Sequence, residues 1–183
     1  KNTSSPWISK LPGHITVVDK KEVIDHISNR RIITHYKYKD GHYDNKERTF
    51  VTFGLVEQYD TEFFEPNDST RERGYAQPSC LKMWFHNGIF GGDAKRAEQY
   101  YRKDSRLSFL AHQSFENNEA LESDEFEKVY RSLAGKMIHQ ELFAVSADGE
   151  PGEHPYQVSH TSYKIRKLQP KTKTHDPSFL AYQ

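Results

Sequence analysis

The stretch RRIITHYKYKDGHYDNKERTFVTFGLV, residues 30–56, decides the fold. Side chains of different type alternate along two parts of it, 30–39 and 47–56, as they do in a β-strand with two unlike faces. Between them, Asp40 to Asn45 read Asp-Gly-His-Tyr-Asp-Asn and supply turn residues. The sequence therefore predicts that these two strands pair as an antiparallel hairpin.

Shorter patterns on both sides of the hairpin predict further elements. β-Branched or alternating runs indicate four more strands, at 14–19, 81–86, 106–115 and 156–168. Two short helices are predicted at 20–28 and 93–103. The first has apolar residues at helical spacing, and the second begins at Asp93, which follows a glycine-rich turn and can cap it.

The longest helical pattern runs from Ser123 to Val145. Ser123 can cap the helix at its start. Its apolar stripe comprises Phe126, Val129, Tyr130, Leu133, Met137 and Ile138. Gly135 would lie inside this helix, where glycine costs about 1 kcal/mol relative to alanine, so we expect close packing at that position.

Strands and helices without regular alternation are typical of an α+β fold. We expect an antiparallel sheet of five or six strands with one long helix and one or two short ones. The length fits a single domain, 14–168, with extended arms at 1–13 and 169–183. Within the domain, 57–79 lacks periodicity and is predicted to be a long irregular segment.

Composition excludes several classes of function. The 26 Lys plus Arg residues are balanced by 26 Asp plus Glu, so the formal net charge is zero. A neutral chain lacks the electrostatic attraction that drives general nucleic-acid binding, which we therefore do not expect. No apolar run approaches the ~18 residues of a membrane helix, and we expect no membrane span.

Cys80 is the only cysteine, which excludes an intramolecular disulfide and any zinc site that needs two thiolates. This favours a reducing interior or an organelle. The triplets at Asn2 and Asn67 fit the glycosylation acceptor pattern, so secretion stays open. Because the sequence begins at Lys1, we expect an N-terminally processed or truncated chain.

Two triplets of the form His-x-Thr/Ser give one catalytic hypothesis. They contain His14 with Thr16 and His160 with Ser162, and both lie on predicted strands. This pair resembles the pattern of 2H phosphoesterases over six residues. The resemblance implies an enzyme in which His14 and His160 act as acid and base on one phosphodiester, while the two hydroxyls hold phosphate oxygens.

No metal or cofactor is predicted. His139 and Glu141 have the spacing of a non-haem iron ligand pair, but positions i and i+2 of the predicted long helix point in different directions. The glycine-rich turn at 87–93 lacks the Lys-Ser/Thr of a phosphate-binding loop, and Asp93 would repel an anion.

Aromatic residues carry the main functional hypothesis. A core poor in leucine can use the aromatics on strands, although an aromatic-lined pocket of a small-ligand carrier stays an alternative. Aromatic and apolar anchors in the arms and in the long segment are predicted to bind a protein partner: Trp7, Phe63, Phe64, Tyr75, Phe179, Leu180 and Tyr182. The sequence thus favours a non-catalytic binding or structural subunit, in a complex or a homo-oligomer, over an enzyme.

Overall fold

The structure is a computed structural model. It describes residues 11–27, 30–64, 77–89, 99–101, 113–116, 121 and 125–183. Most of these residues lie in β-strands. The strands are β1 (Lys20–Asp25), β2 (Arg30–Asp44), β3 (Thr49–Phe64), β4 (Ser79–Phe85), β5 (Gln113–Phe115), β6 (Met137–Val145), β7 (Pro151–His160), β8 (Tyr163–Gln169) and β9 (Ser178–Tyr182). The helix of the described part is α2, Glu125–Ser132.

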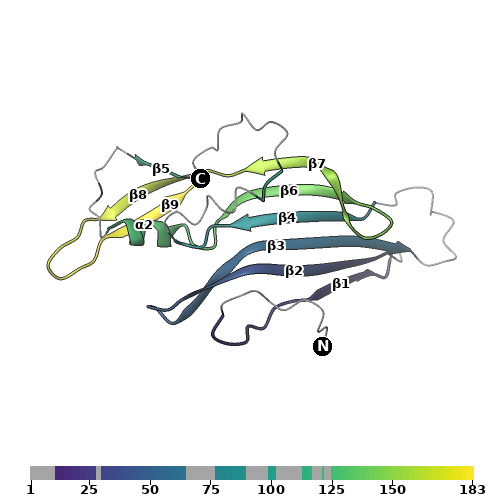
Figure 1. Cartoon of the computed structure of the whole chain (residues 1–183), viewed down its shortest axis with the longest axis horizontal. Helices are drawn as coiled ribbons and strands as arrows, with labels where there is room; N and C mark the ends of the chain where they lie inside the picture. The colour runs from purple at the N-terminus through teal and green to yellow at the C-terminus, as the bar shows by residue number, and fades with distance from the viewer. Residues whose placement is uncertain are drawn as a thin grey trace.

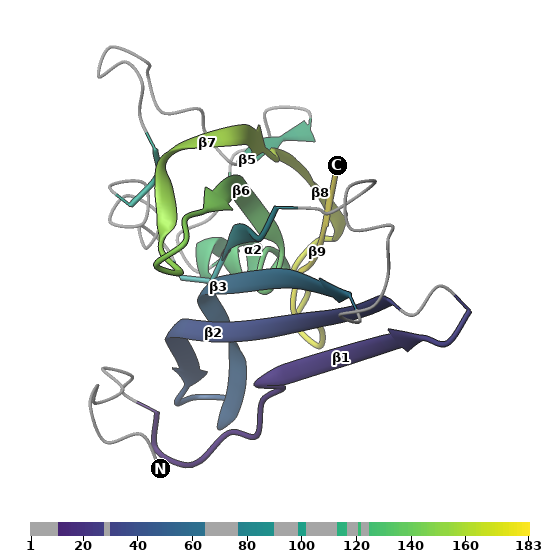
Figure 2. The ribbon, with the colours of Figure 1, turned by 90° about the vertical axis from the view of Figure 1, so that its right-hand side faces the viewer.

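The strands form two sheets (Figure 1). A six-stranded antiparallel sheet has the order β1-β2-β3-β4-β6-β7, and a three-stranded sheet has the order β5-β8-β9. In the small sheet, β8 pairs with β5 in parallel and with β9 antiparallel. The small sheet and α2 lie together at one end of the long sheet, and β1 and β7 form its two open sides (Figures 1 and 2).

The main core lies where the two sheets meet α2. Leu55, Trp84 and Ile138 come from the large sheet, and Val129 and Leu133 come from α2. The small sheet adds its inner face: Tyr163, Ile165 and Ala181, with Phe115 and Phe179 packed alongside. Tyr163 also donates its hydroxyl to the Met137 carbonyl at 2.8 Å, which ties β8 to β6.

The predicted pairing of two strands as an antiparallel hairpin is confirmed, but the turn predicted at Asp40 to Asn45 is misplaced, because β2 runs to Asp44 and the turn is 45–48. Strands β2 and β3 pair antiparallel from Arg30 opposite Phe64 to Asp44 opposite Thr49, with a β-bulge between His42 and Tyr43. The predicted strand at 81–86 is also present, as β4. The pairing was predictable from local alternation, whereas the Asp and Gly residues at 40–44 lie within β2 and do not mark the turn.

The predicted α+β class is wrong, because the described chain is β-rich and its helix is short. The long helix predicted from Ser123 ends at Ser132, and 137–145 is strand β6. Gly135 marks the change: its φ of 75° is a left-handed conformation that ends helices at glycine. The same glycine that was predicted inside the helix therefore terminates it.

Two predictions near the N-terminus are wrong. The helix predicted at 20–28 is strand β1, which pairs with β2 from Lys20 opposite His35 to Asp25 opposite Arg30. The strand predicted at 14–19 is not a strand, although the Asp19 carbonyl accepts a hydrogen bond from the Tyr36 amide at 2.9 Å. A six-residue strand on an existing hairpin edge gains ladder hydrogen bonds that an isolated short helix lacks.

The predicted strand at 156–168 is two strands in different sheets, since β7 ends at His160 and β8 begins at Tyr163. The predicted irregular segment at 57–79 is wrong at both ends, where β3 runs to Phe64 and β4 begins at Ser79. Its residues 65–76 lie outside the described part. So do most of the predicted strand at 106–115, apart from β5, and most of the predicted helix at 93–103.

Candidate docking surfaces

The small sheet has one buried and one exposed face. On β8, Tyr163 and Ile165 are buried, whereas Lys164, Arg166 and Leu168 are exposed. Directly paired residues of antiparallel strands share a face, and Arg166 lies opposite Leu180 while Lys164 lies opposite Tyr182. We call the exposed side the outer face; it comprises Lys164, Arg166, Leu168, Leu180 and Tyr182.

The outer face combines exposed leucines with one fixed cation. Leu168 is 57% exposed and Leu180 is 45% exposed. The Arg166 guanidinium forms a two-point ion pair with Glu116 and lies 5.6 Å from the centre of the Tyr182 ring. Hydrogen bonding to Arg166 lowers the pKa of the Glu116 carboxyl, so that the pair stays charged. The face is therefore ordered and amphipathic before any partner binds.

The β1 side of the large sheet is a second exposed surface. Each of the six residues of β1 is exposed, including Val23 and Ile24. Ile32 of β2, which lies opposite Val23, is exposed as well, and Ile27 beyond the end of β1 is almost fully exposed. Apolar side chains thus surround an edge strand that pairs on one side with β2.

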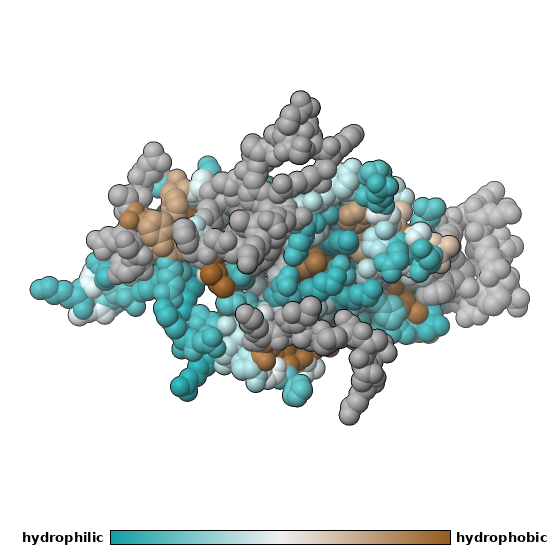
Figure 3. All heavy atoms as spheres, viewed as in Figure 1, coloured by the Kyte–Doolittle hydropathy of each residue, from teal (hydrophilic) through white to brown (hydrophobic). Residues whose placement is uncertain are grey.

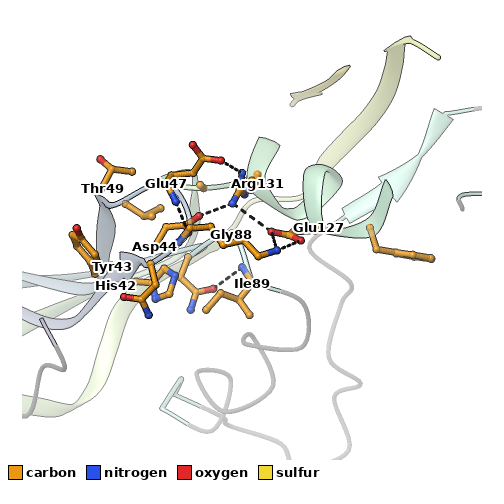
Figure 4. Close-up of a pocket in the computed structure, with 15 residues that line it drawn as sticks. His42, Tyr43, Asp44, Glu47, Thr49, Gly88, Ile89, Glu127 and Arg131 are labelled. Atoms are coloured by element: carbon orange, nitrogen blue, oxygen red, sulfur yellow. Dashed lines mark hydrogen bonds and ion pairs between the residues drawn. The ribbon is translucent and has the colours of Figure 1, made fainter. Parts of the chain in front are cut away.

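A groove of about 770 Å³ lies between the β2–β3 turn and α2 (Figure 4). Arg131 of α2 crosses it, donating to Glu47 at 2.7 Å and to Asp44 at 2.8 Å, while Lys46 donates to Glu127 at 2.7 Å. The apolar part of the lining comes from Val51, Ile89, Phe126 and Ala134. A small-ligand carrier would use a groove of this size, and that alternative stays a prediction.

A buried polar cluster lies under the residue stretch 99–101. Glu141 accepts hydrogen bonds from the Tyr101 amide at 2.6 Å and from the His139 ring at 3.0 Å. The Tyr100 ring stacks on His139 with 3.9 Å between ring centres, and Trp84 donates to Gln99 at 3.1 Å. The cluster fastens 99–101 to β4 and β6.

Sequence reasoning missed this cluster because it placed His139 and Glu141 on a helix. On a strand, positions i and i+2 share a face, so the same spacing brings the two side chains together. The available signal was Gly135, which allows the helix to end before both residues. The described residues contain no group of three or more potential ligands arranged to hold a metal ion.

The residues of the phosphoesterase hypothesis are not brought together. His14 lines a small cavity beside Tyr43 and Phe50, at the turn end of β2 and β3. His160 pairs with His139 on the far side of the sheet, and three strand spacings separate β7 from β3. At about 4.8 Å per spacing, those strands alone contribute about 14 Å, too far for both imidazoles to reach one phosphate. Thr16 and Ser162 are exposed near their respective histidines.

The residues predicted to bind a partner fall into three groups. Leu180 and Tyr182 lie on the outer face, whereas Phe179 packs against the core. The backbones of Phe63 and Phe64 pair with Arg31 and Arg30 at the end of β3. Trp7 and Tyr75 lie outside the described residues. The C-terminal stretch predicted as an arm contains β9, which is part of the small sheet.

Two family models match the sequence. The insecticide toxin TcdB middle/N-terminal region matches residues 1–88, and the insecticide toxin TcdB middle/C-terminal region matches residues 128–183. No curated protein matches the chain significantly. The sequence is thus similar to TcdB middle regions over two separate stretches.

Solved toxin structures share the fold. The crystal structure of TcdB2-TccC3-Cdc42 aligns with a TM-score of 0.73 and 24% identity, covering 92% of this chain and 8% of that chain. TcdB2-TccC3 without its hypervariable C-terminal region aligns with a TM-score of 0.70 and 23% identity, covering 89% of this chain and 8% of that chain. The Photorhabdus luminescens Tc holotoxin pore with the TccC3-D651A mutation aligns with a TM-score of 0.68 and 23% identity. That alignment covers 89% of this chain and 8% of that chain.

The chain therefore has the fold of one part of much longer proteins, and it spans less than a tenth of their length. The matched structures are of complexes that contain TcdB2 and TccC3, and the predicted role of this chain as a subunit of a complex stays a prediction. Among the described residues, no helix is long and apolar enough to span a membrane.

Proposed function

We propose that the chain is a non-catalytic structural module of a TcdB-like toxin subunit, and that its outer face binds a neighbouring protein of the toxin complex. The observation that carries this proposal is the outer face itself. Its two exposed leucines lie on strands whose opposite face belongs to the core, so the surface is rigid as well as apolar. Rigid apolar anchors bind partners with a small loss of conformational entropy.

The polar residues of the outer face restrict which partner it can bind. Arg166 is held by Glu116 and Tyr182, lies directly opposite Leu180 and is two residues from Leu168 on β8, and Lys164 lies opposite Tyr182. Apolar anchors with charged neighbours are the usual arrangement at protein–protein interfaces. The matched structures contain TcdB2 together with TccC3, so we propose a TccC-type subunit as the partner.

The test compares two matched double variants for binding to a purified TccC-type subunit. L168S/L180S removes the apolar anchors of the outer face, and Y156S/V158S removes equally exposed residues from β7. Burying each leucine contributes about 1 kcal/mol, so the first variant should weaken binding by roughly tenfold or more. The second should bind like the unaltered chain.

Thermal unfolding of both variants checks that each is folded before binding is measured by interferometry. Equal binding by the two variants, or no binding by the unaltered chain, would contradict the proposal.

A further inference from the structure

Residues 11–19, which precede β1, lie against the β2–β3 hairpin without forming a strand. We call this stretch the strap. Two hydrogen bonds fasten its end to β2: the Tyr38 hydroxyl donates to the Val18 carbonyl at 3.0 Å, and the Tyr36 amide donates to the Asp19 carbonyl at 2.9 Å. Both bonds lie at the end that leads into β1, so the beginning of the strap is held by other contacts.

The beginning of the strap is held by Leu11, which is partly buried in a seat above Gly41 of β2. A Cβ on Gly41 would lie 3.0 Å from Leu11 Cδ1 and 3.3 Å from the ring edge of Phe53, so only glycine leaves room for both groups without a shift. The preceding Asp40 has a φ of 55°, a left-handed conformation that interrupts the regular strand geometry. Asp40 and Gly41 thus form a seat for the leucine within the strand.

The seat borders a row of aromatic rings on the hairpin. The centre of the Phe53 ring lies 4.8 Å from that of Tyr38 and 4.9 Å from that of Phe50. Phe53 is buried, and Tyr38 and Phe50 are partly buried. Because Leu11 shares the space above Gly41 with Phe53 and the other end of the strap is bonded to Tyr38, the strap covers part of this row.

The middle of the strap fills its site poorly. A cavity of about 300 Å³ lies between residues 12–15 and the part of the hairpin that carries Tyr43 and Phe50. Pro12, Gly13 and His14 are exposed. A segment with few buried contacts and few backbone hydrogen bonds opens at a low cost in free energy. The strap is therefore fastened at its two ends and loosely packed between them.

We propose that the strap is a displaceable cover, which is held closed by Leu11 in its seat and opens about the start of β1 to expose the aromatic row of Tyr38, Phe50 and Phe53. The strap and its seat share no residue with the outer face, so the proposal does not depend on the function proposed above.

Hydrogen exchange in the full chain tests whether the strap opens. The Tyr36 amide loses its acceptor when the strap leaves, whereas the His86 amide, which donates to the Lys136 carbonyl at the same 2.9 Å, reports on the packing near α2. We expect the protection factor of the Tyr36 amide to be at least about tenfold lower than that of the His86 amide. Equal protection of the two amides would overturn the proposal.

Two matched variants within the strap test what keeps it closed. Leu11→Ser removes the apolar side chain from the seat, whereas Val18→Ser changes a side chain that is 57% exposed. Leu11→Ser should lower the protection of the Tyr36 amide about fivefold further and leave the His86 amide unchanged. Val18→Ser should leave both amides unchanged. Equal effects of the two variants on Tyr36, or an equal loss of protection at His86 in Leu11→Ser, would show that Leu11 does not act as a local latch.

A third variant tests what the strap covers. Gly41→Val fills the seat, where even a Cβ would lie 3.0 Å from Leu11, and should hold the strap open. Hydroxyl-radical footprinting should then show Tyr38 and Phe50 at least about threefold more reactive than in the unaltered chain, while the protection of the His86 amide confirms that the fold is retained. Unchanged reactivity of both rings in a variant whose Tyr36 amide has lost its protection would overturn the proposal.

Discussion

Strands β8 and β1 are both short and rich in charged residues, yet they differ in what they bury. Alternate residues of β8 pack into the core, with Ile165 1% exposed, whereas every residue of β1 is exposed. The difference lies in the second layer: α2 and the ends of the long strands cover β8, and no described element covers β1 (Figure 2). Whether one face of an alternating strand is buried is thus decided by the elements packed against it, not by the pattern of the strand itself.

This difference divides the molecule into a packed end and a surface that is open for contacts. Hydrophobic residues appear only as separate patches among hydrophilic ones on the face shown in Figure 3. The exposed apolar residues on the outer face and around β1 are among those whose burial by another protein would remove apolar surface from water.

Truncation at the two strands should show the largest contrast. Ile165→Ala leaves a cavity in the core and should cost about 2–5 kcal/mol of the free energy of unfolding. Ile24→Ala on β1 should cost less than about 0.5 kcal/mol, because its side chain is exposed. Chemical denaturation measures both. Similar losses at the two positions would mean that β1 is covered in solution.

Alanine at Gly135 tests the end of α2 at the packed end. Its φ of 75° is a left-handed conformation, which costs roughly 1–2 kcal/mol for a residue with a Cβ. Gly13→Ala is the matched control, since both positions have open space around an added Cβ but Gly13 lacks the positive φ. Denaturation midpoints should fall for Gly135→Ala alone. Unchanged stability in Gly135→Ala would indicate that the helix continues through this residue.

Removing Arg131 should have a smaller effect. Its ion pairs with Asp44 and Glu47 join the hairpin turn to α2, but these side chains are partly exposed and solvent screens them. We expect Arg131→Ala to cost at most about 1 kcal/mol. A double-mutant cycle with Asp44→Ala isolates the pair. A coupling of several kcal/mol would show that the groove is much drier than its exposure indicates.

The smallest expected effect is a shift in the pKa of the Asp44 carboxyl. Hydrogen bonds from the Glu47 and Lys46 amides lower its pKa, and nearby Arg131 lowers it further. Because the folded pKa lies below the unfolded one, the stabilisation is present above the unfolded pKa and is lost as the pH falls through the folded pKa. Carboxyl NMR should show a pKa below 3.8 that Arg131→Ala raises only slightly. A return to the ordinary value in that variant would mean that the arginine, not the backbone, dominates.

Local signals predicted the parts of the fold that depend on few neighbours. The hairpin of β2 and β3 follows from the alternation along its strands, although its turn, 45–48, lies beyond the Asp- and Gly-containing stretch that was expected to form it. The boundary at Gly135 could not be inferred from periodicity, because an apolar stripe over 126–138 reads equally well as a helix or as a helix followed by a strand. The break between β7 and β8 at Thr161 and Ser162 has no glycine or proline to mark it.

The candidate surfaces were predictable only in part. Leu180 and Tyr182 were identified because they are apolar residues in a polar terminal stretch, and both lie on the outer face. Leu168 and the β1 edge were missed, since exposure on a strand depends on which layers cover it. The contact between the buried His139 and Glu141 could be predicted only with both residues on a strand, where positions i and i+2 share a face.

Hydroxyl-radical footprinting of the chain, alone and bound to a TccC-type subunit, tests the central claim most directly. The account predicts that Leu168 and Leu180 lose most of their reactivity in the complex, while Tyr156 and Val158 on β7 keep theirs. Unchanged reactivity of Leu168 and Leu180 in a complex that has formed would contradict it.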